Sequence, residues 1–210
     1  MQLSSLALTL HSDKAIDRSS VSSFGPYFQG ALMELVDSEY VDLLHSTAVN
    51  PYSQHVRLGG AKGSETPRSG ASLHWTINTL DEDAAAHLHA PFLVDAVTQV
   101  QLNTPGLTLA VKEVSTPTVL PESHLTNIFY SSTPPNRFRI EFVTPTAFRS
   151  QGQYVFWPDP RLVVQSLALK HSALASGDEP DEDLIDEFGR AVHMTSYHLA
   201  SHPFALAGNR

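Results

Sequence analysis

Hydrophobic and polar residues alternate with a period of two in several short segments in the first half of the chain. This alternation is the pattern of strands that are buried on one face only. In one such segment Leu73, Trp75 and Ile77 take every second position. Strands with this pattern are predicted at residues 3–10, 52–58, 72–80 and 107–114.

Apolar residues at helical spacing predict helices between these strands. One helix begins near Pro26 behind a Ser23 cap, and a short helix after it ends at His45. Another begins at Asp81, since acidic side chains are favourable at a helix N-terminus. The order of elements is therefore strand, helix, strand, strand, helix, strand. This is the ferredoxin-like arrangement, in which the helices pack on one face of an antiparallel sheet.

A second half of the chain begins after a linker with two successive prolines at residues 131–136. Phe138, Ile140 and Phe142 alternate with charged residues and predict a strand. A further strand is predicted near residues 194–199. These two strands are fewer than a ferredoxin-like domain needs.

Helical material lies between these two predicted strands. Asp159 is expected to cap a helix whose first residue is Pro160, and a second helix is predicted to end near Phe188. We therefore predict an α+β chain with two ferredoxin-like domains in tandem, of which the second is incomplete at its C-terminus. The predicted domains are residues 1–132 and residues 133–210.

The composition is that of a globular chain without a membrane-spanning segment. Of the 210 residues, 41% are hydrophobic, and no apolar run approaches the roughly 20 residues that cross a bilayer. The chain has no cysteine, which excludes disulfides and thiolate zinc sites. Its 13 basic and 22 acidic residues give a formal net charge of −9, which argues against broad attraction to nucleic acid. We expect a soluble, cytoplasmic protein.

The 11 histidines do not form a metal-binding motif. His87 and His89 are two residues apart, on opposite sides of a helix, whereas a helical zinc site needs ligands four residues apart. We therefore expect no metal ion and no cofactor. The chain also lacks the glycine-rich phosphate loop and the serine nucleophile elbow, which removes support for nucleotide hydrolysis and esterase chemistry.

His45 is the histidine whose predicted position favours chemistry. It lies at the join of a helix and a loop, shortly before the strand at residues 52–58. The negative end of a helix stabilises an imidazolium, which suits a group that transfers protons near neutral pH. Most single histidines are nevertheless structural or solvated, so this position alone does not make His45 catalytic.

Two segments of the chain resemble one known family. Residues 138–167 resemble the start of the second domain of the CRISPR-associated protein six family, with the sequence F-R-I-E-F-V-T-P-T-A-F-R-S-Q-G-Q-Y-V-F-W-P-D-P-R-L-V-V-Q-S-L. Residues 23–55 resemble its N-terminal region, with the sequence S-F-G-P-Y-F-Q-G-A-L-M-E-L-V-D-S-E-Y-V-D-L-L-H-S-T-A-V-N-P-Y-S-Q-H. The family consists of endoribonucleases that cut CRISPR precursor transcripts and are built from two ferredoxin-like domains.

The resemblance implies metal-independent cleavage of CRISPR repeat RNA. In this reaction a ribose 2′-hydroxyl attacks the adjacent phosphate, which leaves a 2′,3′-cyclic phosphate and a 5′-hydroxyl. The family's catalytic histidine corresponds to His45, as general base or general acid. Tyr27 corresponds to an assisting tyrosine of the family, although a helical tyrosine can equally be a core aromatic.

The chain departs from the family's pattern in two places. The family often has a lysine soon after the histidine, but residues 46–51 contain none. His55 is a candidate second proton-transfer group there, and Arg57 is the nearest cation. The family's glycine-rich loop near the C-terminus has no counterpart before Arg210, so we expect a fragment, or a loop supplied elsewhere.

RNA contacts would need a local basic surface in so acidic a chain. The candidate side chains are those of Arg57, Arg137, Arg139 and Arg149, with Lys62 and Arg68 in the loop of the predicted hairpin. The resemblance implies CRISPR repeat RNA as the partner. It leaves open a CRISPR effector complex and a homodimer as further partners.

Two other functions stay open at this point. The missing lysine and the short second domain are compatible with a non-catalytic RNA-binding or scaffold subunit of a CRISPR ribonucleoprotein. Binding without turnover at any pH from about 5 to 9, where histidine titrates, would favour that subunit. A ferredoxin-like interaction module unrelated to RNA is the other alternative, and absence of RNA binding even at low salt would favour it.

Overall fold

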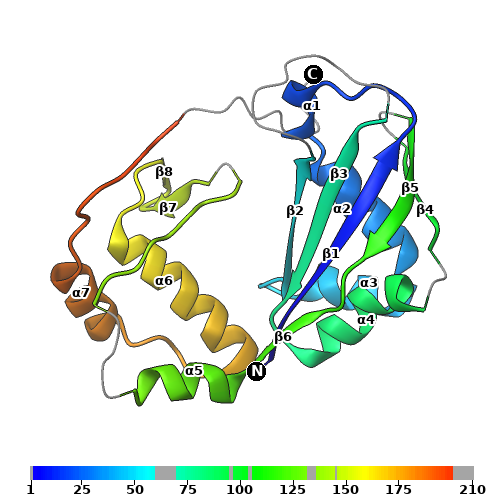
Figure 1. Ribbon diagram of the computed structural model, residues 1–210. Coiled ribbons are helices and arrows are strands. Elements are labelled where there is room, and N and C mark those ends of the chain that lie inside the picture. The colour runs from blue at the N-terminus through cyan, green and yellow to red at the C-terminus, as the bar shows by residue number, and fades with distance from the viewer. Residues whose placement is uncertain are drawn as a thin grey trace. The chain divides into compact units, whose positions relative to one another are not determined.

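The chain forms two compact units, one within residues 1–138 and the other within residues 139–203 (Figure 1). The structure is a computed structural model, and it describes residues 2–59, 70–94, 97–103, 106–131, 136–144 and 146–200. The domain boundary predicted between residues 132 and 133 falls beside residues outside these ranges and stays a prediction.

The first unit contains an antiparallel sheet. Its strands are β1 (Gln2–Ser12), β2 (Tyr52–Leu58), β3 (Ser72–Thr79), β4 (Gln99–Leu102), β5 (Leu107–Val114) and β6 (Thr118–Pro121). The strand order is β2-β3-β1-β5-β4, and β6 pairs with the first residues of β1. Without β4 and β6 this is the predicted ferredoxin-like order, so both short strands are additions to it.

Helices connect the strands of this sheet, and α5 follows its last strand. They are α1 (Arg18–Val21), α2 (Gly25–Leu35), α3 (Ser38–Ser46), α4 (Glu82–Leu93) and α5 (Glu122–Phe129). Asp37 and Asp81 cap α3 and α4, with carboxylates that accept from the backbone N–H groups of Tyr40 and Ala84. The predicted Ser23 cap of α2 is wrong, because α1 occupies the preceding residues and no side chain caps α2.

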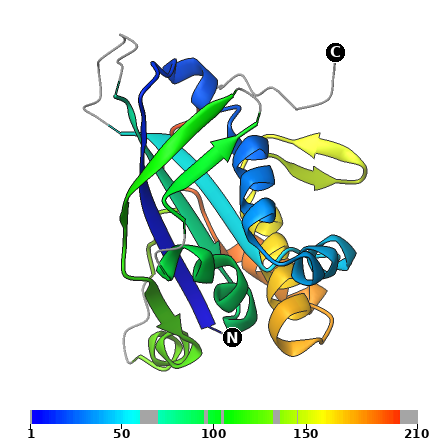
Figure 2. The same cartoon turned by 90° about the vertical axis from the view of Figure 1, so that its right-hand side faces the viewer.

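One hydrophobic core lies between the sheet and its helices. The alternation of the sequence is reproduced in burial, since Leu6, Leu8 and Leu10 of β1 are buried and the residues between them are not. Phe28 of α2 packs edge-on against Trp75 of β3. Both α2 and α4 supply this same core, and they lie on the same side of the sheet in Figure 2. On β3 the residues of the opposite face are polar, namely Ser72, His74, Thr76 and Asn78.

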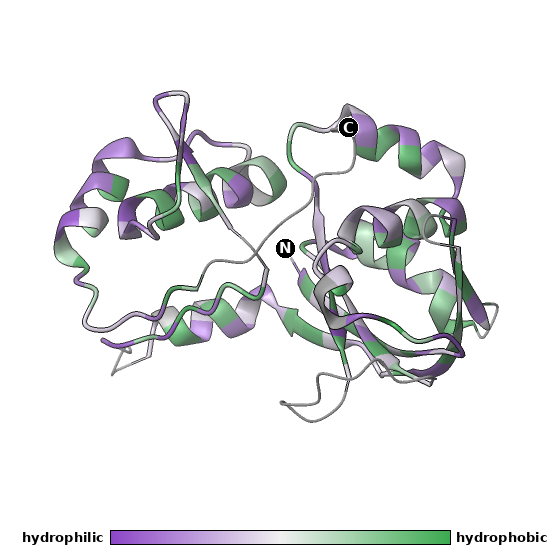
Figure 3. Ribbon diagram, turned by 90° about the horizontal axis from the view of Figure 1, so that it is seen from above, coloured by the Kyte–Doolittle hydropathy of each residue, from purple (hydrophilic) through white to green (hydrophobic). Residues whose placement is uncertain are grey.

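The second unit contains a short hairpin and two helices. Its elements are β7 (Phe148–Ser150), β8 (Gln153–Val155), α6 (Pro160–His171), the π-helix η1 (Ser172–Ser176) and α7 (Glu182–Ala191). Asp159 caps α6 and Pro160 is its first residue, as predicted. Hydrophobic and hydrophilic bands alternate along these helices in Figure 3. None of the helices in the described ranges is long and apolar enough to cross a membrane.

Two strands predicted for the second half do not form. Phe138, Ile140 and Phe142 lie in irregular backbone and are 61%, 51% and 42% exposed. The segment at residues 194–199 is irregular as well. Among the described residues of this unit, β7 and β8 pair only with each other. Alternation marks which face of a strand would be buried, but a strand also needs a paired neighbour.

Candidate functional site

The C-terminal turn of α3 presents His45 to solvent. Tyr40 and Leu44 are the α3 side chains that are buried, and His45 follows Leu44 on the exposed side of the helix. The predicted position of His45, at a helix end just before a strand, is therefore confirmed. Within the described ranges its ring makes no hydrogen bond or ion pair, which leaves both ring nitrogens available to a ligand.

The strand after this helix carries two more of the predicted residues. His55 and Arg57 are two residues apart on β2, so they lie on one face of the sheet, opposite Thr76 and His74 of β3. Arg57 is exposed and His55 is half-buried. Burial lowers the pKa of His55 below its ordinary value of 6.5, and the charge of Arg57 lowers it further. Both effects favour the neutral ring, which can accept a proton.

Tyr27 lies in α2 and is half-buried. Its ring packs against the core and meets Phe24 edge-on, with 6.3 Å between ring centroids. No hydrogen bond or ring contact joins it to His45 in the part of the chain that the structure describes. These contacts agree with a core aromatic and give no support to a chemical role.

Of the remaining predicted cations, Arg137, Arg139 and Arg149 are exposed. Arg137 lies in irregular backbone of the first unit, and Arg139 lies in irregular backbone of the second. Arg149 is on β7, opposite Tyr154. Lys62 and Arg68 lie outside the described residues. Arg57 is thus the predicted cation that a regular element holds in the same unit as His45.

A cluster at the start of α3 was not predicted from the sequence. Asp37 accepts the cap hydrogen bond with Oδ1 and accepts a hydrogen bond from His87 Nδ1 with Oδ2, across 2.8 Å. The His87 ring stacks on Tyr40, with centroids 4.0 Å apart and an interplanar angle of 6°. The sequence shows only an Asp83 and His87 pair at the spacing of one helical turn.

The electrostatics of this cluster follow from these contacts. The Tyr40 backbone N–H and then the His87 ring hold the pKa of Asp37 below its ordinary value of 3.8. Burial, followed by the negative charges of Asp81, Asp83 and Asp37, raises the pKa of Tyr40 to about 12. Asp37 is therefore ionised and the Tyr40 hydroxyl is protonated near neutral pH.

The histidine pair at residues 87 and 89 faces opposite sides of α4, as predicted. His89 is 2% exposed, and its Nε2 donates to the carbonyl of Ile77 across 3.2 Å. Burial lowers the pKa of His89, so the ring is a neutral member of the core. In the described ranges no group of three or more His, Asp or Glu side chains could hold a metal ion.

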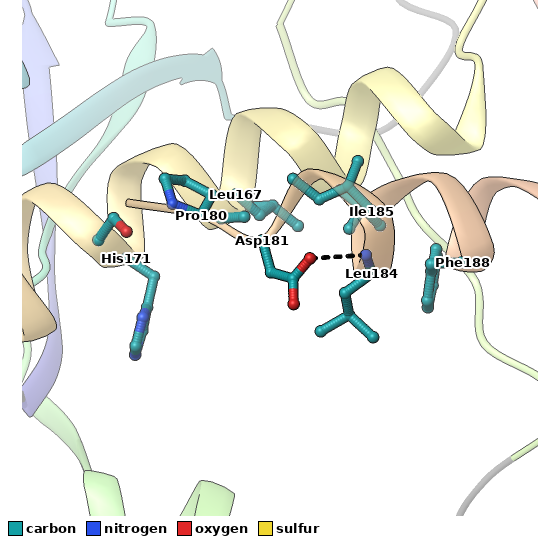
Figure 4. Close-up of a pocket in the computed structure, with 10 residues that line it drawn as sticks. Leu167, His171, Pro180, Asp181, Leu184, Ile185 and Phe188 are labelled. Carbon is teal, nitrogen blue, oxygen red and sulfur yellow. Dashed lines mark hydrogen bonds between the residues drawn. The ribbon is translucent and has the colours of Figure 1, made fainter. Parts of the chain in front are cut away.

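An apolar groove of about 470 Å³ lies in the second unit, between α6 and α7 (Figure 4). Leu167, Leu184 and Phe188 line it together with the polar side chains of His171 and Asp181. The Asp181 carboxylate accepts from the Leu184 backbone N–H across 3.0 Å and so caps α7. None of the predicted site residues lines this groove.

Comparison with protein families and curated proteins identifies relatives over nearly the whole chain. The family model for CRISPR-associated endoribonuclease Cas6 matches residues 140–203. A CRISPR-associated endoribonuclease Cas6 of Mycobacterium tuberculosis is 42% identical over 208 residues, which cover 99% of this chain and 63% of the relative. A Cas6 of Streptococcus thermophilus is 34% identical over 185 residues, or 87% of this chain and 70% of the relative. The chain thus spans less than two thirds of the Mycobacterium relative.

Solved structures agree on the fold. A Cas6 product complex has a TM-score of 0.57 at 24% identity, and the match covers 90% of this chain and 71% of that one. A histidine-to-alanine mutant of the same protein has a TM-score of 0.54 at 25% identity, over 90% and 69% of the two chains. These likenesses confirm the predicted fold class of tandem ferredoxin-like domains. The described part of the second unit contains only a hairpin and helices of such a domain.

Proposed function

The chain belongs to the family of CRISPR-associated endoribonucleases Cas6, and on that premise we propose that it cuts CRISPR precursor RNA within the repeats without a metal ion. The observation that carries the proposal is the position of His45. It is an exposed histidine at a helix end, without an intramolecular partner in the described ranges, in a chain whose relatives are endoribonucleases. The reaction would take place in the cytoplasm.

The proposed chemistry is attack by a ribose 2′-hydroxyl on the adjacent phosphorus. A general base takes the hydroxyl proton, the new O2′–P bond forms, and the bond from phosphorus to the 5′-oxygen breaks. A general acid gives a proton to that leaving oxygen. The products are a 2′,3′-cyclic phosphate and a 5′-hydroxyl, so neither water nor a metal-bound hydroxide is consumed.

His45 is the proposed proton-transfer group, in the role of base or acid. The lowered pKa of His55 suits a second group that accepts a proton, although His55 is less exposed than His45. Arg57 on the same face of β2 would stabilise the negative charge that develops on the phosphate, where the family often has a lysine. Tyr27 remains a secondary candidate.

The arginines that the sequence singled out are proposed RNA contacts. Arg137, Arg139 and Arg149 are exposed, as groups that meet a phosphate backbone must be. If they contact phosphates, replacing one should weaken binding to all RNA sequences and reduce its salt dependence. A CRISPR effector complex and a homodimer stay proposals for partners beyond RNA.

The test uses the full-length protein that contains this chain, with its cognate repeat RNA in the presence of a chelator. We expect one cut in the parent, and binding without cutting in His45→Ala. His124→Ala is the matched control, since His124 is also an exposed histidine on a helix of the first unit. Cutting by His45→Ala at the parent's rate would show that His45 is not the catalytic group. Complete dependence of the parent on added metal would refute the mechanism.

A non-catalytic RNA-binding or scaffold subunit is the second candidate function. The observation that favours it is the absence of lysine from residues 46–51, just after the histidine, where the family often has one. Tight binding of repeat RNA without turnover between about pH 5 and pH 9 would establish it, because histidine changes its charge within that range.

A further inference from the structure

Few side chains attach α3 to the rest of the first unit, although its last turn carries His45. Tyr40 and Leu44 are each 5% exposed and are the buried α3 side chains, and the partly buried Val41 packs against the same core. The His45 ring bonds to none of the residues that the structure describes. The position of the His45 ring is therefore set by the backbone of α3, because no side-chain contact of the ring itself holds it in place.

His87 attaches the first turn of α3 to α4 in two ways. Its Nδ1 donates to Asp37, whose second carboxylate oxygen caps α3, and its ring lies flat against Tyr40. One side chain thus contacts both the cap and the buried tyrosine of the helix. The contact joins residues 50 positions apart in the sequence, so it is a tertiary link and no part of the helix itself.

We propose that His87 is a positioning residue that fixes the tilt of α3 and thereby the place of the His45 ring. The inference rests on the proposed function of His45. Buried Tyr40 and Leu44 anchor α3 in the core, and the hydrogen bond to Asp37 attaches the cap about 10 Å from Leu44, given a rise of about 1.5 Å per residue. Without His87 the cap loses its link to α4 and Tyr40 loses its stacking partner, so the tilt of α3 changes and the His45 ring moves with the helix.

One hydrogen bond and one ring contact hold the His87 side chain. Asp37 accepts from its Nδ1 across 2.8 Å, and the Tyr40 ring lies flat against the imidazole. Asp83 Oδ1 lies 3.7 Å from Nε2, which is too long for a hydrogen bond. The hydrogen bond sets the direction of the ring and the stacking sets its plane, so the ring has little freedom to rotate, which is what a positioning group requires.

Three variants of the full-length protein separate these contacts. His87→Ala removes the stacking and the hydrogen bond, and His87→Phe keeps only the stacking. Asp37→Ser keeps a side chain that can cap α3 but removes the acceptor for His87. His124→Ala again serves as the control. The measurements are the single-turnover cleavage rate, the Kd for repeat RNA, and the NMR signals of the His45 ring, assigned by their loss in His45→Ala.

We expect His87→Ala and Asp37→Ser to lower the cleavage rate by about 10- to 100-fold, because displacement of a reacting group by about 1 Å has effects of that size. The Kd should stay within about 3-fold of the parent, since no RNA contact is removed. The His45 signals should shift in both variants and stay in place in His124→Ala. His87→Phe should lie between the parent and His87→Ala.

Failure of this inference is distinct from failure of the proposed function. Folded His87→Phe and Asp37→Ser proteins that cut within about 2-fold of the parent, with unmoved His45 signals, would overturn the positioning role of His87 alone. A parent that does not cut, or a His45→Ala variant that cuts normally, would overturn the proposed function. In that case the NMR signals still decide whether His87 sets the position of His45.

Discussion

Removing the Gln54 side chain should destabilise the first unit by way of Trp75. The Trp75 indole Nε1–H donates to Gln54 Oε1 across 2.9 Å, and this hydrogen bond links β2 to the core under β3. Trp75 itself is fully buried. In Gln54→Ala the indole N–H keeps its buried place but loses its acceptor.

The expected loss follows from that unpaired donor. A buried donor left without a partner costs about 1–3 kcal/mol, more than the net gain of an ordinary hydrogen bond. Gln54 is only half-buried, so a water molecule that enters the space would bring the loss toward about 1 kcal/mol. Ser53→Ala is the matched control on the same strand, since the Ser53 hydroxyl makes only an exposed hydrogen bond of 3.4 Å with Asn78.

The chain offers a clean assay because it has two tryptophans, one in each unit. In a Trp157→Phe background the fluorescence of Trp75 reports the unfolding of the first unit in urea. We expect Gln54→Ala to lose about 1–3 kcal/mol and Ser53→Ala to change by less than about 0.5 kcal/mol. Equal effects of the two substitutions would refute the argument that the Trp75 hydrogen bond ties β2 to the core.

Three further predictions concern packing and charge. Gly189→Ala should destabilise the α6 and α7 pair, because the added Cβ would lie 2.8 Å from Cβ of Arg161. Gly30→Ala, whose Cβ would meet open space in α2, should instead raise the free energy of unfolding by about 0.5–1 kcal/mol. Thermal unfolding measures both effects. Tyr40→Phe should remove an absorbance change of tyrosinate near pH 12. Because folding raises the pKa of Tyr40, its contribution to the stability of the protein is present below pH 10.0 and is lost as the pH rises toward about 12. Folding lowers the pKa of Asp37, so its contribution to the stability of the protein is present above pH 3.8 and is lost as the pH falls below that value. The difference in stability between the parent and Asp37→Asn should therefore shrink below pH 3.8. A constant difference would contradict the linkage.

Much of the first unit could be predicted from its alternation of residues. The buried face of β1 and the acidic start of α4 follow from local pattern, because each depends on residues close in sequence. β4 and β6 were missed, since four residues carry too little pattern to mark a strand. The strand predicted around Ile140 failed for another reason, because its pattern was clear but the described chain supplies no partner strand.

In the candidate site too, features that depend on neighbouring residues could be predicted and features that depend on tertiary contacts could not. The place of His45 at the end of α3 could be predicted, since it needs only the helix and the turn that follows. The contact of Asp37 with His87 could not, because only the folded core brings α3 and α4 together. The pKa shift of His55 likewise depends on burial that the sequence of β2 alone does not reveal.

The most direct test of the central claim changes one atom of the RNA. The full-length protein is given repeat RNA with a single 2′-deoxy nucleotide on the 5′ side of the cut phosphate, in chelator, beside the all-ribose repeat. The account predicts one cut with a 2′,3′-cyclic phosphate end in the all-ribose RNA and no cut at that phosphate in the deoxy RNA. Cutting of both RNAs at the same phosphate would contradict it, because the nucleophile would then be water and not the ribose hydroxyl.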